Sequence, residues 1–222
     1  MKVMARKIAH LITPQPVLEG AGVRLKRSIG TKALDYLDPF LLLDHFQSQD
    51  AVDYEAGFPL HPHRGIETVT YLLAGAVRHR DTLGNSGEIA AGDVQWMTAG
   101  RGIMHEEMPQ VRPEGVAGFQ LWVNLPAKLK MAAPRYQNIG AHEIPVLRRV
   151  DSATIRVIAG SVDGVSGPIS GIAADPLYLD VELTPWATFV YPVPRGHTAF
   201  AYVFEGAGRF DTEKELLVAG PR

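Results

Sequence analysis

The chain has 222 residues, enough for one large β-domain or for two of about 110 residues each. Its net charge is -2 and its 22 basic residues are scattered, so the basic footprint of a direct nucleic-acid binder is missing. It contains no cysteine, which excludes disulfides, thiolate metal sites and cysteine nucleophiles and suits a reducing compartment. Residues 40–43 form the longest apolar run, which is too short to cross a membrane, and no signal-peptide core follows the N-terminus. We therefore expect a cytoplasmic protein without a membrane or nucleic-acid partner.

Short apolar or alternating segments, separated by turns rich in Gly and Pro, predict an all-β fold. In chain order, we expect strands at residues 23–27, 40–43, 66–73, 77–81, 94–98, 119–124, 155–159, 177–183, 187–191 and 198–204, with a short helix within 127–133. Asp44 and His45 follow the second of these strands and are interpreted as a hydrogen-bonded pair that closes it. Gly100 and Gly102 stand close together and predict a tight bend with positive φ or a close backbone approach.

Residues 65–75 and 196–206 resemble each other, because the glycines at both ends and the central tyrosine match at one constant offset. This self-similarity predicts two copies of one β-fold. At the same offset, His61 and His63 both fall on prolines, so the second copy lacks the two imidazoles. The expected organisation is an N-terminal barrel with a metal site in 1–128, a connection in 129–150, and a metal-free, shortened barrel in 151–222.

Two pairs of metal-ligand residue types stand out, His61 with His63 and His105 with Glu107. In a β-strand, residues i and i+2 point to the same face, so two facing strands would bring the four side chains to one point. Three imidazoles and a carboxylate suit a mid-row divalent transition metal, with positions left open for water, O2 or a substrate. A His-x-His pair alone is often two exposed loop histidines, but the second pair favours a metal site.

The segments around these pairs, residues 58–69 and 92–105, resemble the two signatures of the pirin family, within the cupin superfamily. The resemblance continues over residues 37–46, 106–109 and 121–126, and more weakly up to Phe210. It implies a bicupin, in which two jelly-roll (double-stranded β-helix) barrels lie face to face and only the N-terminal barrel binds iron.

The same resemblance implies a ligand set of His61, His63, His105 and Glu107 for one divalent metal. Fe(II) is the expected ion, and Mn, Ni, Co and Cu remain alternatives. The wider cupin pattern nominates Glu67 instead, which the pirin resemblance leaves as an alternative ligand or as a partner of the ligands. Glu67 lies an even number of residues from His63, so strand parity does not exclude it.

For function, the resemblance implies a quercetinase-type dioxygenase, which cleaves a flavonol or a related enol-containing aromatic with O2. The alternative is a non-catalytic, redox-sensing regulator that binds a protein partner. A sugar-phosphate isomerase would need a cluster of Arg and Lys that the motifs lack. In the enzyme, Glu107 is the candidate general base. Trp96, Met97 and Met104 are candidates for an apolar pocket, with ordinary barrel core as the alternative.

Overall fold

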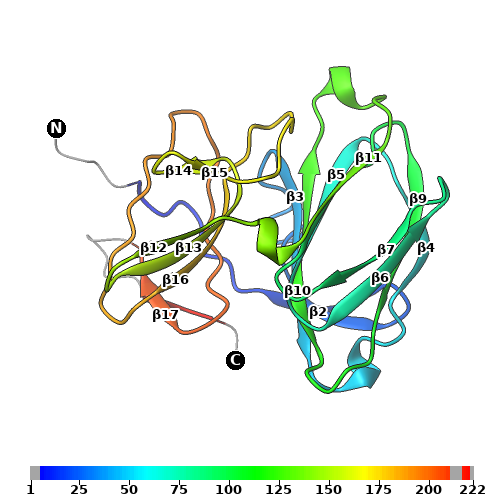
Figure 1. Ribbon diagram of the computed structural model, residues 1–222, viewed down its shortest axis with the longest axis horizontal. Coiled ribbons are helices and arrows are strands. Elements are labelled where there is room, and N and C mark those ends of the chain that lie inside the picture. Colours follow the sequence, from blue (N-terminus) through cyan, green and yellow to red (C-terminus); the bar gives the residue numbers. More distant parts are fainter. Residues whose placement is uncertain (1–5, 211–216, 221–222) are drawn as a thin grey trace.

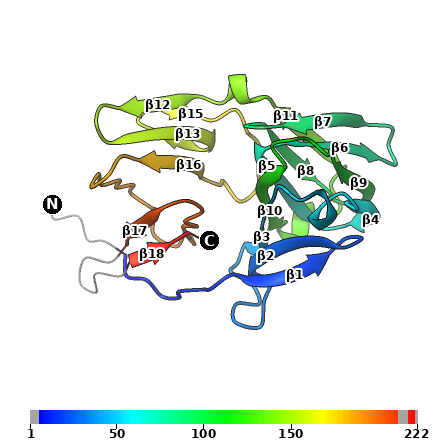
Figure 2. The ribbon, with the colours of Figure 1, turned by 90° about the horizontal axis from the view of Figure 1, so that it is seen from below.

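The computed structural model describes residues 6–210 and 217–220. It shows two groups of strands side by side, one coloured blue to green and the other yellow-green to red (Figure 1). Strands dominate the regular structure of both groups, so the all-β prediction is confirmed. The N-terminal segment runs along the second group before it enters the first (Figure 2). In the second group, the Arg6 guanidinium donates hydrogen bonds to the carbonyls of Pro194 (2.6 Å) and His197 (2.7 Å). None of the helices among the described residues has the length and apolar character that spanning a membrane requires.

The first group is a sandwich of two sheets. In spatial order from one edge to the other, the larger sheet contains β1 (Gln15–Glu19), β2 (Val23–Ile29), β3 (Phe40–Ser48), β10 (Val116–Asn124), β5 (Ile66–Ala74), β8 (Val94–Thr98) and β11 (Arg135–Ile139). In the same order, the smaller sheet contains β4 (Phe58–His63), β9 (Ile103–Pro109), β6 (Ala76–Asp81) and β7 (Ser86–Ala90). Two short 3-10 helices lie in the loops, η1 (Ala51–Asp53) and η2 (Ala127–Leu129), and the helix expected within 127–133 is confined to η2. Leu72 of the larger sheet packs with Val77 and Ile89 of the smaller one, which makes the sandwich one buried core.

The second group consists of smaller sheets. They contain β12 (Val146–Arg149), β13 (Ala153–Ala159) and β16 (Tyr178–Leu183), then the pair β14 (Ser161–Val162) and β15 (Val165–Ser166), and the pair β17 (Ala207–Arg209) and β18 (Leu217–Ala219), with η3 (Ala141–Glu143) before them. Residues 211–216 and 221–222 of the expected C-terminal unit lie outside the described part of the chain. The expected connection, 129–150, holds both β11 and β12, which pair into different sheets. We propose that the two groups are the two units of the chain, and that the boundary between these units lies within residues 129–150.

The larger sheet is buried on both of its faces. On β5, Leu72 points into the sandwich, whereas Tyr71 points toward the second group. There Tyr71 belongs to one buried cluster with Ile158, and its hydroxyl donates a 2.7 Å hydrogen bond to Asp180. Burial on both faces explains why the apolar residues of β5 do not alternate strictly with polar ones.

The strands predicted at residues 187–191 and 198–204 are wrong, because both segments run without strand pairing. Prolines surround the first segment and remove amide donors that a sheet ladder needs. The second segment attaches through its side chains, since the rings of Tyr202 and Phe204 pack on Phe119 of β10 with centroids 5.4 and 5.5 Å away. The second copy of the repeat therefore shares the apolar pattern of β5 but not its hydrogen bonding.

Asp44 and His45 do not bond to each other, and β3 continues past both of them. Neighbouring residues of a strand point to opposite faces of the sheet. The Asp44 carboxylate accepts two 2.7 Å hydrogen bonds from Arg27, whereas Nδ1 of His45 lies 3.1 Å from the Tyr202 hydroxyl. The prediction of a pair that closes a strand end is therefore wrong.

Candidate metal centre

The two predicted ligand pairs lie on adjacent strands of the smaller sheet. His61 of β4 stands directly opposite His105 of β9 in the antiparallel register. Strand alternation turns His63, His105 and Glu107 into the sandwich, where all three are buried. The two strands therefore lie next to each other, as the sequence analysis assumes, with His61 directly opposite His105.

A tight bend before β9 aligns its histidine with those of β4. Gly100 and Gly102 have φ values of +51° and +130°, which confirms the predicted bend. A β-carbon on Gly100 would collide with the carbonyl oxygen of Ala132. The carbonyl of Gly100 accepts a 2.8 Å hydrogen bond from the amide of Gly65, which lies in the turn after β4. This bond ties together the turns that flank the two ligand strands.

The imidazoles of His61, His63 and His105 form a compact group, with ligand nitrogens that all lie within 4.8 Å of one another. Nδ1 of His61 lies 2.9 Å from the carbonyl oxygen of Pro59, so a proton on Nδ1 satisfies this contact and leaves the lone pair on Nε2. That Nε2 is 3.0 Å from Nε2 of His63. At this distance the two nitrogens share either a proton, in a hydrogen bond between the rings, or a cation, so the contact is compatible with a metal ion.

The lowered pKa values of two of the imidazoles also favour metal binding. Burial lowers the pKa of His63 to about 4 and the pKa of His105 to about 3, and neighbouring histidines contribute to both shifts. At neutral pH both rings are therefore uncharged and have lone pairs to donate. Both ring nitrogens of His105 are buried without a hydrogen-bond partner among the described residues. A buried polar group without a partner is costly, and a bound cation would remove that cost.

Glu107 lies at the edge of this group. Its Oε2 is 3.9 Å from Nε2 of His105, and its Oε1 accepts a 2.9 Å hydrogen bond from the hydroxyl of Thr70. The group of ligand atoms within 4.8 Å of one another contains the three histidines but not Glu107. The carboxylate is next to this group and is hydrogen-bonded through its other oxygen to Thr70.

Glu67 faces away from the histidines. It lies on β5 two residues before Val69, which packs in the buried cluster between the sandwich and the second group. Its Oε1 accepts a 2.8 Å hydrogen bond from Thr98, and burial raises its pKa. The sheet itself thus separates Glu67 from the candidate metal centre.

Replacing Glu67 with Gln is therefore expected to leave metal content near that of the wild type. The amide keeps an acceptor for Thr98 and removes only a charge on the far face of the sheet. Metal analysis after loading with Fe(II) measures this, with the stability of the variant recorded alongside. Complete loss of metal in a folded variant would make Glu67 the carboxylate ligand.

The three residues named as pocket candidates lie in different places. Trp96 is 1% exposed and packs in the cluster between the two groups of strands, and Met97 is fully buried beside Ala99 and Ile103. Met104 is 39% exposed and lies on β9 between inward-facing neighbours, so it points outward. An open cavity of about 490 Å³ reaches one of the three histidines, and its lining includes His63, Arg64, Asp35, Leu42, Ile66 and Trp122.

Several residues near the site escaped the sequence analysis. Trp122 of β10 packs edge-on against His63, with ring centroids 5.1 Å apart. His79 of β6 is paired with Glu107 in the register and stacks on Tyr136. The sequence did contain a signal for His79, because it alternates with Arg78 and Arg80 and such alternation is typical of a strand with one charged face. In the structure the two arginines are exposed and His79 is buried. Trp122 becomes a neighbour of His63 only through long-range pairing, which no local pattern reveals.

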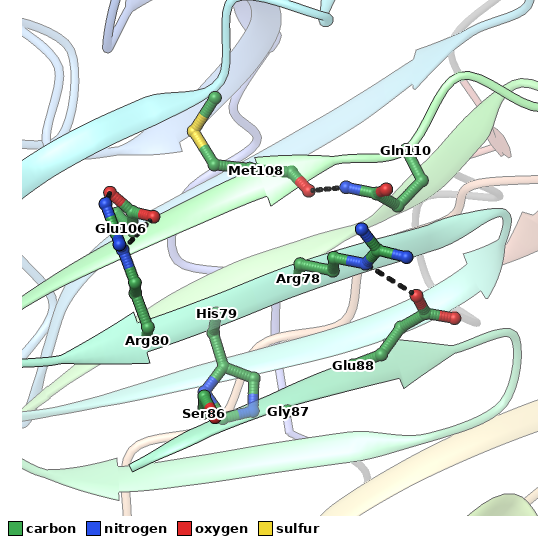
Figure 3. A pocket seen from close by; sticks show the side chains of 9 residues that line it. All are labelled: Arg78, His79, Arg80, Ser86, Gly87, Glu88, Glu106, Met108 and Gln110. Carbon is green, nitrogen blue, oxygen red and sulfur yellow. Dashed lines mark hydrogen bonds and ion pairs between the residues drawn. The ribbon is translucent and has the colours of Figure 1, made fainter. Parts of the chain in front are cut away.

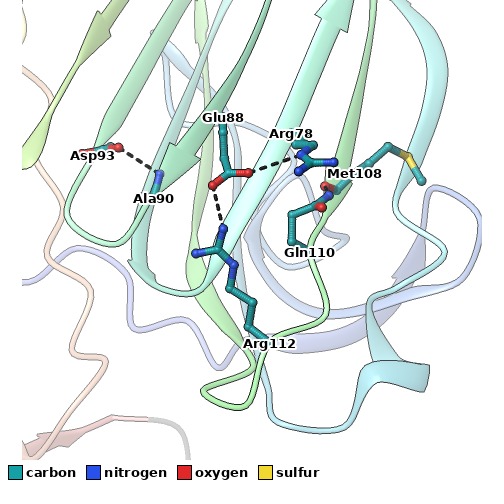
Figure 4. A network of polar contacts seen from close by, with 7 residues as sticks. All are labelled: Arg78, Glu88, Ala90, Asp93, Met108, Gln110 and Arg112. Atoms are coloured by element: carbon teal, nitrogen blue, oxygen red, sulfur yellow. Dashed lines mark hydrogen bonds and ion pairs between the residues drawn. The ribbon is translucent and has the colours of Figure 1, made fainter.

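A second cavity, of about 520 Å³, lies on the outer face of the smaller sheet. Its arginines are paired there: Arg78 with Glu88 at 3.3 Å, and Arg80 with Glu106 through a 3.2 Å hydrogen bond (Figure 3). Arg112 adds a 2.7 Å contact to Glu88 (Figure 4). These side chains alternate with inward-facing residues of β6 and β9, so this charged surface is on the other side of the sheet from the histidines.

Comparison with known proteins gives consistent matches. A family model described as Pirin matches residues 22–123. A pirin-like protein of Caulobacter vibrioides is 49% identical over 205 residues, which are 92% of this chain and 74% of that protein. A crystal structure from Geobacillus kaustophilus is 38% identical with a TM-score of 0.82, over 98% of this chain and 84% of that one. A quercetin 2,3-dioxygenase structure from Acinetobacter baumannii is 36% identical with a TM-score of 0.77, over 88% of this chain and 70% of that one. The structural neighbours confirm the predicted bicupin fold class.

Proposed function

Because the chain belongs to the pirin family, we propose that it is a metal-dependent dioxygenase that cleaves a flavonol or a related enol-containing aromatic with O2. His61, His63, His105 and Glu107 would hold one divalent transition metal, expected to be iron. The observation that carries this proposal is the group of close imidazoles, two of them held neutral by burial, next to a carboxylate and a cavity. The proposed substrate class is taken from the name of the Acinetobacter relative, a quercetin 2,3-dioxygenase.

When bound, the metal would supply Lewis-acid chemistry, which lowers the pKa of the flavonol 3-hydroxyl and orients the ring for O2. The chain contributes the surroundings of that reaction. We propose Glu107 as the group that accepts the hydroxyl proton, because it is the carboxylate next to the histidine group, 3.9 Å from Nε2 of His105. The cavity beside His63 is lined by the indole of Trp122 and by the aliphatic side chains of Leu42 and Ile66, with Asp35 and Arg64 also in its wall. The apolar part of this lining would pack against one side of a planar aromatic substrate.

The second candidate function is a redox-sensing regulator that uses the same ligands to control binding of a protein partner. An exposed basic patch on the first group of strands would favour that function. The arginines on the outer face of the smaller sheet are instead paired with Glu88 and Glu106. The cavity beside His63 offers a small molecule a place next to one proposed ligand, and we therefore prefer the dioxygenase.

The test is anaerobic loading with Fe(II), followed by addition of quercetin and O2 while the flavonol absorbance is recorded. The wild type is expected to consume quercetin in proportion to its bound iron, and His105→Ala to fall to the background rate. His142→Ala is the matched control, because His142 is exposed on η3 and should leave turnover unchanged. One bound iron per chain without turnover would contradict quercetin as the substrate and favour the regulator or another substrate.

A further inference from the structure

The hydroxyl of Thr70 lies between two side chains inside the sandwich. It is 2.9 Å from Oε1 of Glu107 and 2.7 Å from Oε1 of Gln120. Thr70 on β5 stands opposite Gln120 on β10 in the antiparallel register, so the two are fixed neighbours. Thr70 is buried, and its strand is among the most enclosed of the first group. The three side chains form a short polar chain that ends at the candidate metal centre.

The protons of this chain can be assigned from its chemistry. An ionised carboxylate has no proton to donate, and a threonine hydroxyl has one. Thr70 therefore cannot donate to Glu107 and to the amide oxygen of Gln120 at the same time. A half-turn of the Gln120 amide brings its NH2 group to Thr70 with nearly the same shape. In that arrangement Gln120 would donate to Thr70 and Thr70 would donate to Glu107, so both short contacts of the hydroxyl would be hydrogen bonds.

Resting on the proposed metal site, we infer that Thr70, supported by Gln120, holds Oε1 of Glu107 so that this carboxylate binds the metal through Oε2 alone. Oε2 is the oxygen that faces His105, at 3.9 Å from its Nε2. A carboxylate that bound through both oxygens would occupy one further coordination position. Thr70 thus keeps that position open for substrate or O2, as a positioning residue that does not touch either.

The other neighbour of Glu107 does not take this role. His79 is paired with Glu107 across β6 and β9, but its ring stacks on Tyr136, with centroids 6.0 Å apart and an interplanar angle of 27°. Gly87 makes room for this ring, because a β-carbon there would be 2.8 Å from Nε2 of His79. Within the described part of the chain, the hydrogen bond that orients Glu107 comes from Thr70.

The experiment is titration of the metal-free full chain with Co(II), whose absorption spectrum depends on coordination number and geometry. Thr70→Val, which keeps the shape and removes the hydroxyl, is expected to change the spectrum of bound Co(II). It should also weaken Co(II) binding by roughly 10- to 100-fold, as loss of a group that orients a ligand does. Thr70→Ser keeps the hydroxyl and should restore both the spectrum and the affinity.

Thr98→Val is the matched control, because it removes an equivalent buried hydrogen bond, 2.8 Å to Glu67, on the opposite face of the sheet. It should leave the Co(II) spectrum unchanged even if thermal stability falls. Gln120→Met is a second variant that decides the matter if Thr70→Val does not fold, and it should shift the spectrum in the same direction.

The outcomes separate the two proposals. A wild type that binds no Co(II) would overturn the metal site and this inference together. A wild type that binds Co(II), with a folded Thr70→Val of the same spectrum and affinity, would overturn only the role of Thr70. A spectral change in Thr98→Val equal to that in Thr70→Val would also overturn the role of Thr70, because the change would then come from a general effect on packing.

Discussion

Replacing His63 with Ala is expected to abolish tight metal binding. The variant removes one of three converging imidazoles whose nitrogens lie within 4.8 Å of one another. We expect the affinity for Fe(II) or Co(II) to fall by at least about 100-fold, since loss of a group that merely supports a ligand already costs roughly 10- to 100-fold. Competition with a chelator of known affinity gives the dissociation constant, and elemental analysis gives the metal content.

His142→Ala serves again as the control, because it removes an exposed histidine from the same chain. The fold of His63→Ala is checked by circular dichroism, so that lost metal is not confused with lost structure. An unchanged metal content in a folded His63→Ala would contradict the proposed set of ligands.

Replacing Trp96 with Ala is expected to cost about 3–5 kcal/mol of unfolding free energy, as for other large aromatic residues removed from a core. Trp96 is 1% exposed and packs in the cluster that joins the sandwich to the second group of strands. Its replacement leaves a cavity in the contact between the two groups. Chemical denaturation measures the effect, with Trp186→Ala as the matched control, because Trp186 is 96% exposed and should change stability by less than about 0.5 kcal/mol.

This comparison also decides whether Trp96 is a core residue or a pocket residue. A core residue changes the unfolding free energy and leaves flavonol binding to the folded protein intact. If Trp96→Ala were as stable as the wild type and lost flavonol binding, Trp96 would instead be part of the substrate pocket.

The sequence was sufficient to predict that His61, His63 and His105 come together, because their arrangement follows a local rule. The i, i+2 spacing on two short strands requires only that each strand alternates and that the strands face each other. The strands β5 and β8 were equally accessible, since runs of apolar and β-branched residues mark them. Gly100 and Gly102 indicated the bend because few other residues adopt positive φ.

The position of Glu67 could not be obtained in the same way. Parity along one strand allows Glu67 to share a face with His63, but the chain does not remain in one strand between them. Gly65 has a φ of +70° and turns the chain from β4 in the smaller sheet to β5 in the larger one. A parity argument fails across such a turn, and nothing local shows which sheet the next strand joins.

The neighbours Thr70, Gln120 and Trp122 were missed for a related reason. Each reaches the site through the register of β10 with β5 or through the packing of the larger sheet on the smaller one. The prediction of strands at 187–191 and 198–204 was wrong because apolar side chains there pack on other parts of the protein while the backbone forms no strand hydrogen bonds. Pattern identifies residues that must be buried, but not the partner that buries them.

The most direct test of the central claim is the crystal structure of the protein loaded with Co(II) or Fe(II), with anomalous diffraction recorded at the absorption edge of the metal. The account predicts one anomalous peak between the ring nitrogens of His61, His63 and His105, in contact with Oε2 of Glu107. A peak beside Glu67 and Thr98, or a loaded crystal with no peak at the three histidines, would contradict it.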